Sequence, residues 1–558
     1  METQSTSVLS VPAPEADGVA LRLRPISPPI PLRGPRDGGW WDIDLRTLGL
    51  ADGAYEYEFE VDRGGTRRSV VDPYAEELSD GPCLRAVMHL RQGRRVRPAF
   101  SWEGELPPGG LPGNNELVMC ELPLRQPERG DGRPTLEGPL LDEIERALAR
   151  SGVNCIQMLP IQDSPDQLNG GYGTRFFFAP DRAIGSPAAL RRFIKRCHQR
   201  GIRVIMDLVM NHAHECPLRD LAFDWFFLRD GAEEPDRELR PRPAWGGDVF
   251  RYRTPQGGRF HAREFQYQVA AFFIEEYHVD GFRIDEFKGI DNYEFIQTLT
   301  DRAHALQDRL YRGQRPFVVI GEDSGRRIEI TTGAGYNGRR VVDAVWDFGF
   351  RDEIRRLVSD PMPEACARRL LGASNAGFSD LANRVAYCTS HDVPPGEENR
   401  LLPYYLGGLD GAIGRERTAK EMLRSTFALM LTAAGIPMFL AGEESAREES
   451  YGIPELIRLR AAHPALRRNE LEFLDVEGGE GVLAYCRTGG KPPGCAGQVI
   501  VIANCGVRDS PTVEIVWPWA AAAELREIGG SGGTPSVADG RARLGLRAHE
   551  TRVFTVEG

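Results

Sequence analysis

The sequence predicts an α/β protein: a (β/α)8 TIM barrel with an insertion after strand 3, flanked by an N-terminal and a C-terminal β-sandwich. Two observations lead to this prediction. Eight apolar, strand-like runs recur along the middle of the chain, and helical patterns separate most of them. Both ends of the chain instead carry short strand-like runs, punctuated by proline and glycine, with little helical periodicity.

The N-terminal part, residues 1–113, predicts a small β-sandwich. Its strand-like runs are Leu21–Pro25, Ala54–Val61 and Ala86–Gln92, in which apolar residues alternate or cluster. The proline- and glycine-rich link Pro107–Gly113 then separates this region from the barrel.

Residues 114–467 carry the alternation that a barrel requires. The predicted strands are Leu117–Leu124, Asn154–Ile161, Val204–Asn211, Gly281–Asp285, Phe317–Asp323, Ala344–Phe350, Arg384–Asp392 and Ile436–Glu444. The clearest helical patterns are Leu190–Gly201, Gln268–His278, Tyr293–Tyr311 and Leu456–Leu466. A doubly wound open sheet is the alternative, but no glycine-rich phosphate loop follows any strand.

The largest insertion, about residues 213–265, follows the third strand and is rich in proline, arginine and tryptophan. We expect an irregular lobe over the barrel mouth. Its aromatic residues are candidates for lining a cleft, namely Trp225, Phe226, Phe227 and Trp245. Residues 468–558 return to strand-like runs and predict the second sandwich.

Composition and charge narrow the choice of partners. The net charge is −12, and no run of Lys and Arg with interleaved aromatics occurs, so nucleic acid and anionic membranes are poor partners. The longest apolar run, Phe427–Ala441, is broken by Gly435 and Pro437 and is too short to span a bilayer. The start of the chain lacks a signal-peptide pattern, and the ten cysteines are scattered singly, so we expect a cytoplasmic protein. The oligomeric state stays open.

Polar residues end several of the apolar strands, and in a barrel these ends share one mouth. Asp285, Glu322 and Asp392 end the fourth, fifth and seventh strands. An isolated Arg-x-Asp such as Arg283–Asp285 would usually be an ordinary ion pair, but three carboxylates that converge need a functional reason. Cleavage of a glycosidic bond needs one ionised and one protonated carboxyl group.

The surroundings of these residues predict their roles. Arg283 stands two residues before Asp285 on the same strand face, so we expect it to keep the pKa of Asp285 low, as a nucleophile requires. Glu322 follows the apolar run Phe317–Gly321, so we expect burial to raise its pKa into the range of an acid/base catalyst.

Four ordered motifs resemble the signatures of the α-amylase superfamily, glycoside hydrolase family 13. They are DLVMNH (Asp207–His212), GFRIDEFK (Gly281–Lys288), VIGED (Val319–Asp323) and TSHD (Thr389–Asp392). The segments GGYGTRFFFAPDRAIGS and GIPMFLAGEE resemble the family's sequences after strand two and at strand eight. In the N-terminal region, WWDIDL, GAYEYEFEVD and VVDPYA resemble a family 48 carbohydrate-binding module.

The resemblance implies a role for each matching residue. It makes Asp285 the nucleophile, Glu322 the acid/base and Asp392 the residue that holds and distorts the sugar. The residues that it places around the same sugar are Tyr172 as a stacking platform, Asp207 as a partner of Arg283, and His212, Arg283 and His391. The tryptophans of the N-terminal module, Trp40, Trp41 and Trp102, either stack on sugar or belong to its core.

No metal ligand set is predicted for catalysis, and no cofactor is required. His212 and His214 form an H-x-H pattern, but in metal-dependent barrel hydrolases this pattern closes the first strand, whereas here it follows the third. Asn211 matches a calcium ligand of many α-amylases, so structural calcium is possible.

The resemblance implies the reaction class more firmly than the substrate. Lys288, three residues after Asp285, resembles the residue that α-amylases cutting internal α-1,4 bonds have at this position. The segments Glu322–Asp323 and Ser390–Asp392 instead resemble the sequences of branching enzymes. The leading hypothesis is a retaining hydrolase of α-1,4-glucans or maltooligosaccharides. The alternatives are a 1,4-α-glucan branching enzyme, a debranching or trehalose-releasing relative, and an inactive glucan-binding scaffold.

Overall fold

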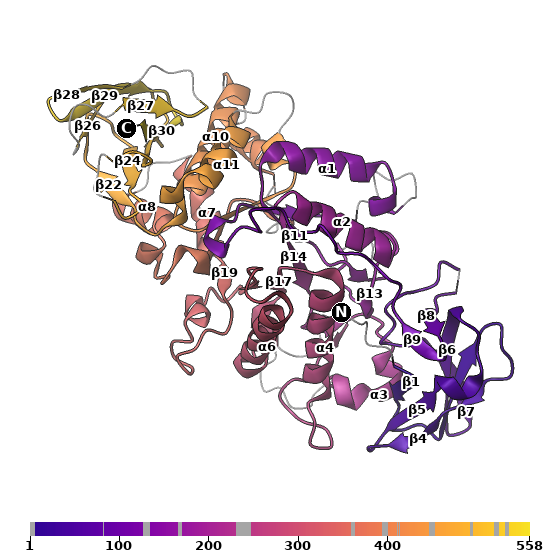
Figure 1. Ribbon diagram of the computed structural model, residues 1–558. Helices are drawn as coiled ribbons and strands as arrows, with labels where there is room; N and C mark the ends of the chain where they lie inside the picture. The colour runs from indigo at the N-terminus through magenta and orange to yellow at the C-terminus, as the bar shows by residue number, and fades with distance from the viewer. Residues whose placement is uncertain are drawn as a thin grey trace.

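The computed structural model places three regions along the long axis of the molecule (Figure 1). N-terminal sheets lie at one end, the barrel lies in the middle, and C-terminal sheets lie at the other end. The described residues are 6–81, 83–125, 134–165, 170–229, 247–358, 363–392, 400–409, 411, 413–445, 452–491, 495–517, 524–529 and 535–557.

A closed barrel of parallel strands forms the middle region, as predicted. The strands follow one another around the ring in chain order, and β21 closes the ring by pairing with β10. The barrel strands are β10 (Met119–Leu122), β11 (Cys155–Met158), β14 (Arg203–Leu208), β17 (Gly281–Ile284), β18 (Val318–Gly321), β19 (Ala344–Trp346), β20 (Arg384–Tyr387) and β21 (Ile436–Leu440). All their residues are buried, which explains why the sequence shows near-continuous apolar runs.

Each barrel strand ends earlier than predicted, and the polar residues that follow it lie in loops at the barrel mouth. The difference is largest for β20, which ends at Tyr387 instead of Asp392, and β19 ends at Trp346 instead of Phe350. Asp347 accepts a hydrogen bond from the Phe350 amide (3.0 Å) and so starts helix α7 (Phe348–Leu357) directly after the strand. Asp285 likewise opens a loop after β17.

Helices follow most of the barrel strands along the chain. They are α1 (Leu140–Ser151), α2 (Pro187–Gln199), α4 (His261–Tyr277), α5 (Phe287–Ile290), α6 (Tyr293–Tyr311), α7, α8 (Glu364–Leu371), α9 (Leu401–Gly408), α10 (Arg415–Thr432) and α11 (Ile453–Ala462). Helix α6 matches its predicted bounds because Asn292 caps it, accepting from the Phe295 amide at 3.0 Å. Helix α2 starts earlier than predicted, because Ser186 caps it and Pro187 suits the first helical position.

The insertion after β14 contains regular structure, which the sequence did not predict. Helix α3 (Leu218–Phe226) lies within it, and β15 (His212–Ala213) pairs with β16 (Asp248–Val249). Helix α4 already begins at His261. Residues 230–246, which include Trp245, lie outside the described residues. A shorter hairpin, β12 (Gln162–Asp163) with β13 (Phe176–Pro180), follows β11.

Two of the aromatic residues predicted for the cleft pack in the core instead, so for these two the prediction was wrong. Phe226 and Phe227 are buried in the core. Trp225 stacks on His261, with ring centroids 4.0 Å apart. Large apolar side chains are stabilised by burial in the core, so only those that the core does not take up can line a cleft.

The N-terminal region forms two antiparallel sheets. The first has the order β1 (Val8–Pro12), β5 (Trp40–Asp44), β4 (Arg33–Arg36). The second has the order β3 (Ile30–Pro31), β2 (Gly18–Leu23), β6 (Gly53–Arg63), β8 (Ala86–Arg91), β9 (Arg94–Val96), with β7 (Thr66–Val70) also on β6. Trp41 is buried and its indole N–H donates to the Ala13 carbonyl (3.0 Å), so it serves the core of this region.

The C-terminal region also forms two antiparallel sheets. One has the order β22 (Glu472–Leu474), β24 (Val482–Arg487), β25 (Val499–Asn504), β30 (Thr551–Glu557), β27 (Glu524–Glu527). The other has the order β23 (Val476–Glu477), β26 (Ser510–Val516), β29 (Arg541–Leu546), β28 (Ser536–Ala538). Within the described part of the chain, no helix has the length and apolar character to span a membrane.

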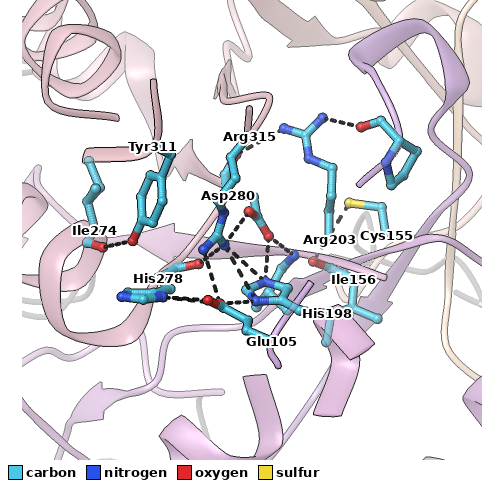
Figure 2. A network of polar contacts seen from close by, with 12 residues as sticks. Glu105, Cys155, Ile156, His198, Arg203, Ile274, His278, Asp280, Tyr311 and Arg315 are labelled. Atoms are coloured by element: carbon cyan, nitrogen blue, oxygen red, sulfur yellow. Dashed lines mark hydrogen bonds and ion pairs between the residues drawn. The ribbon is translucent and has the colours of Figure 1, made fainter. Parts of the chain in front are cut away.

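A network of buried charged side chains lies at the amino-terminal end of the barrel (Figure 2). It includes Glu105, which belongs to the segment between the N-terminal region and the barrel. His198 lies between two carboxylates: its Nδ1 is 2.6 Å from Glu105, and its Nε2 is 2.8 Å from Asp280. Arg315 donates to the same two residues, at 3.0 and 2.8 Å. Arg203, at the start of β14, donates to the Asp280 carbonyl (3.0 Å). We call these five residues the base cluster.

Candidate active site

Arg283, on β17, lies fully buried at the barrel mouth among four carboxylates. Its Nη1 donates to Asp207 (2.8 Å) and to Asp285 (2.9 Å). Its Nη2 lies 2.7 Å from Glu322 Oε2 and 4.0 Å from Asp392 Oδ2. The structure therefore brings together the three carboxylates that the sequence placed at separate strand ends. We call Arg283 and these carboxylates the mouth cluster.

A buried aromatic ring supports this guanidinium. The Cζ atom of Arg283 lies 4.5 Å from the ring centroid of Trp346, which ends β19 and is almost fully buried. This contact favours a charged guanidinium over the ring face. Trp346 was not among the residues predicted from the sequence, although an aromatic residue at a strand end is a signal for such a role.

Asp285 does not have the low pKa that its neighbour Arg283 predicted. Burial raises the pKa of Asp285 well above its ordinary value; Arg283 opposes this rise, whereas Glu322, Asp207 and Asp392 add to it. The prediction was wrong because a single guanidinium is shared among several carboxylates. Protons bound here belong to the cluster of carboxyl groups and not to one residue alone.

Glu322, directly after β18, has the raised pKa that the sequence predicted. Burial raises the pKa of Glu322 to about 7, Arg283 opposes the rise and Asp392 adds to it. Its Oε2 accepts a hydrogen bond from the Glu286 amide (2.9 Å). Glu286 adopts a left-handed backbone (φ 44°), which is unusual for a residue with a side chain, and this conformation immediately follows Asp285. The backbone after Asp285 thus orients the carboxyl group of Glu322.

Asp392 lies at the open edge of the site beside His391. Its side chain is about half exposed, and its Oδ1 is 3.2 Å from His391 Nε2. On the other side of the ring, His391 Nδ1 lies 2.8 Å from the carboxylate of Glu121, which is completely buried. Glu121 was not among the residues predicted from the sequence, although a charged residue inside the apolar strand run Leu117–Leu124 is a signal for a functional role.

Tyr172, Asp207 and His212 complete the wall behind Arg283. The Tyr172 hydroxyl donates to Asp207 (2.7 Å), and its ring stacks on His391 with centroids 4.9 Å apart. His212 Nε2 lies 3.0 Å from the Tyr172 carbonyl, and burial lowers the pKa of His212 to about 4, so this histidine is neutral. These predicted residues therefore form one connected set of contacts at the mouth.

The loop that carries Tyr172 explains the Gly170–Gly171 pair before it. Gly171 has a φ of +95°, and a Cβ atom there would collide with the guanidinium of Arg125. Arg125 is buried, donates to the Gly170 carbonyl (3.1 Å) and pairs with Asp181 (3.1 Å). Only glycine leaves room for this brace.

Lys288 and Asp323 follow Asp285 and Glu322 closely in the chain but lie outside the mouth cluster. Lys288 is exposed on α5. Asp323 binds Arg327 with two ion-pair hydrogen bonds (2.9 and 2.7 Å), and Arg327 also donates to Asp291 (2.6 Å) beyond α5. Arg327 therefore ties the loop of Glu322 to the segment after Asp285.

Three residues carry sequence patterns that metal sites share, namely His212, His214 and Asn211. Within the ranges that the structure describes, no three His, Cys, Asp or Glu side chains gather in a group that could hold a metal ion. His214 faces Glu215 at 3.8 Å instead of joining His212. The Asn211 carbonyl accepts from the Phe250 amide (3.1 Å). Structural calcium stays a prediction.

The chain is similar to known enzymes over most of its length. Residues 145–254 match the family model "Alpha amylase, catalytic domain". A 1,4-alpha-glucan branching enzyme of Nitrosococcus oceani is 25% identical over 480 residues, which cover 79% of this chain and 59% of that protein. A cyclomaltodextrinase of Geobacillus thermopakistaniensis is 26% identical over 408 residues, which cover 66% of this chain and 62% of that protein. The chain thus spans about three fifths of the length of these two relatives.

Solved structures share the fold at low sequence identity. A pullulanase from Bacillus acidopullulyticus superposes with a TM-score of 0.71 at 17% identity, over 100% of this chain and 74% of that one. A type I pullulanase from Bacillus subtilis, solved with maltose, gives 0.72 at 18% identity, over 100% and 86%. These matches extend through the barrel and both flanking β regions.

Proposed function

The chain is a relative of the α-amylase family, and from this premise we propose that it is a retaining glycosidase that cleaves α-1,4-glucosidic bonds of glucans or maltooligosaccharides. The observation that carries the proposal is the mouth cluster. Asp285 and Glu322 bind the two Nη atoms of one guanidinium, at 2.9 and 2.7 Å, so their carboxyl groups face the same small space. A retaining mechanism needs two carboxyl groups about 5 Å apart.

The proposed first step is attack of an Asp285 oxygen on the anomeric carbon. Glu322 gives its proton to the leaving glycosidic oxygen as that bond breaks, and a glucosyl ester of Asp285 forms. Burial keeps the pKa of Glu322 at about 7, so near neutral pH it holds the proton that this step requires. Glu322 then accepts a proton from water, which attacks the ester and restores Asp285.

Other mouth residues bind and orient the sugar in this proposal. Asp392 and His391 stand side by side at the open edge, where they are placed to bind adjacent hydroxyl groups. Tyr172 offers its ring as a platform, and this ring is held by its stack on His391. Asp207 has a supporting role, because it holds both Arg283 and the Tyr172 hydroxyl.

A second candidate is transfer of the glucosyl unit to a sugar 6-hydroxyl, which makes branches. Two 1,4-alpha-glucan branching enzymes are among the relatives, at 25% and 24% identity, and this observation favours it. Debranching and trehalose release share the same architecture. An inactive glucan-binding scaffold is less favoured, because this chain keeps all three acids.

Incubation with amylose separates hydrolysis from transfer. Hydrolysis predicts that reducing ends rise in step with cleavage of the chains. Loss of iodine colour with few new reducing ends would favour branching and overturn the hydrolytic proposal. Binding of amylose with neither change would favour the scaffold.

We further propose that the protein works in a reducing compartment such as the cytoplasm. All ten cysteines are described, and each is unpaired, which suits such a compartment. The N-terminal sheets are proposed to act as a carbohydrate-binding-like module. Trp102 stacks on His278 of the barrel (3.9 Å), which favours a bracing role for that tryptophan. Comparing activity in reducing and oxidising buffer tests the compartment proposal.

A further inference from the structure

A completely buried carboxylate lies behind His391, on the first strand of the barrel. Glu121, on β10, accepts hydrogen bonds from the His391 backbone amide (2.6 Å) and, through its other oxygen, meets His391 Nδ1 (2.8 Å). Gln157 of the neighbouring strand donates to the same side chain at 3.4 Å. A buried carboxylate costs free energy unless charge and hydrogen bonds compensate it, so its partners are informative.

These two contacts define the orientation of the imidazole ring. The hydrogen bond from the His391 amide fixes the position of the backbone, and the contact at Nδ1 fixes the rotation of the imidazole ring. The Tyr172 ring stacks on one face of the imidazole at an interplanar angle of 14°. His391 Nε2 is then presented toward Asp392, with 3.2 Å to its Oδ1. Both ring nitrogens therefore face carboxylates, and only the imidazolium can donate to both.

The charges around His391 agree with this geometry. Burial lowers the pKa of His391, but the attraction and hydrogen bond of Glu121, together with Asp392, outweigh it and raise the pKa to about 9, against opposition from Arg283. The titratable and charged groups that face the ring from all sides are Glu121, Asp392, Arg283, Tyr172 and Asp207. Glu121 is the partner that both binds the ring and is fully removed from solvent.

We propose that Glu121 is a positioning residue that holds His391 as an oriented imidazolium, so that Nε2–H donates at the sugar end of the site. This inference rests on the proposed glycosidase function. Glu121 touches no substrate; it acts through His391. Asp392 and the substrate then meet a donor that stays charged through neutral pH, which compensates part of the excess negative charge at the mouth.

The test is the substitution Glu121→Gln, which keeps the shape and the acceptor for the backbone amide but removes the charge. The first readout is the NMR titration of His391 in protein labelled with 13C-histidine, assigned by its loss in His391→Gln. We expect His391 to titrate near pH 9 in the wild type and to be neutral at pH 7 in the variant. This readout needs no substrate.

Glu443→Gln is the matched control. Glu443 follows the adjacent strand β21, is buried, and also accepts a backbone amide bond, from Leu401 (3.3 Å), but it does not contact His391. The control should leave the His391 titration unchanged. If Glu121→Gln and Glu443→Gln shift the titration equally, or neither shifts it, the positioning role is wrong.

The second readout is kcat/KM on an α-maltosyl fluoride, whose leaving group needs no proton from Glu322. In the wild type we expect a loss above about pH 9 as His391 loses its proton, and in Glu121→Gln a loss of about 10- to 100-fold already at pH 7. In the His391→Gln background, Glu121→Gln should add no further loss. Additive losses there would overturn the proposal. A wild type that cleaves neither fluoride nor glucan would instead refute the proposed function, while the NMR result would still stand.

Discussion

The barrel carries a buried charge cluster at each end, and the two differ in how cations and carboxylates are balanced. In the base cluster, the carboxylates of Glu105 and Asp280 meet His198 and Arg315 at hydrogen-bond distances, and Arg203 donates to the backbone carbonyl of Asp280 (Figure 2). In the mouth cluster, by contrast, four carboxylates lie within 4.0 Å of one guanidinium. Apart from the half-exposed Asp392, the carboxylates of both clusters are buried, so burial alone does not distinguish the clusters.

The imbalance shows in the direction of the pKa shifts. Burial raises the pKa of Glu105, but hydrogen bonds from His198 and His278 and the charge of Arg315 outweigh it and lower the pKa to about 2. At the mouth, burial and carboxylate neighbours together raise the pKa of Glu322 to about 7 despite Arg283. A cluster whose carboxylates are balanced by cations therefore stabilises the fold. A cluster with excess carboxylates instead keeps a carboxyl group protonated near neutral pH, where it can act as an acid.

Asp285→Asn tests the mouth cluster and has the largest expected effect. Turnover of glucan should fall by a factor on the order of 10⁴, because the nucleophile is removed, while glucan binding persists. The melting temperature should stay the same or rise, since one of four competing carboxylates is gone. Turnover, calorimetric binding and thermal melting measure the three outcomes. Retention of full activity would show that Asp285 is not the nucleophile.

Asp280→Asn makes the opposite test at the base. It removes one of the two buried carboxylates that balance His198, Arg315 and Arg203, so the free energy of unfolding should fall by about 3–5 kcal/mol. The kcat of the folded fraction should be unchanged, because the base lies at the far end of the barrel. Asp301→Asn is the control, since Asp301 is an exposed partner of Arg339 and should change stability by less than about 0.5 kcal/mol. Equal effects of the two changes in denaturant unfolding would contradict the role of the base cluster.

The mouth residues could be predicted from sequence because each follows a buried strand. Asp285, Glu322 and Asp392 stand out where a run of apolar residues ends, and a closed ring brings all such ends together. Helix α6 could be predicted to the residue, because its cap Asn292 and its periodicity are local features.

Pairings between distant strands could not be predicted in the same way. Glu121 meets a histidine 270 residues away, and the contact exists only because the ring closes between β21 and β10. The pKa of Asp285 was predicted from Arg283 alone, two residues away, whereas Asp207 and Glu322 reach the same guanidinium from other strands. Local sequence shows one partner of a charge, and the fold decides how many others share it.

The two clusters also predict opposite effects of pH on stability. The pKa of Glu105 falls from 4.5 to about 2 on folding, so its contribution is present above pH 4.5 and is lost as the pH falls toward 2. The pKa of Glu322 rises from 4.5 to about 7, so its contribution is present below pH 4.5 and is lost as the pH rises through 7. Each effect is about 3 kcal/mol.

Two glutamine substitutions measure how Glu105 and Glu322 make the free energy of unfolding depend on pH. Glu105→Gln should lower the free energy of unfolding at pH 7 and change it little at pH 2. Glu322→Gln should raise it at pH 8 and change it little at pH 4, where the wild-type carboxyl group is protonated in both states. Denaturant unfolding across this range is the measurement. Parallel slopes for the two variants would mean that the ends of the barrel do not differ in charge balance.

The pH dependence of catalysis makes the smallest and most specific test of the mouth. Glu322 must be protonated to act as the acid, and its pKa is about 7, so kcat/KM on a glucan should fall above pH 7 to about one tenth of its plateau at pH 8. An α-maltosyl fluoride needs no proton on its leaving group, so its kcat/KM should stay level between pH 7 and pH 8. Glu322→Gln should lose activity on the glucan and keep most of the first step with the fluoride. A fall for both substrates over the same pH range would assign the titration to another group, such as His391, and remove the acid role from Glu322.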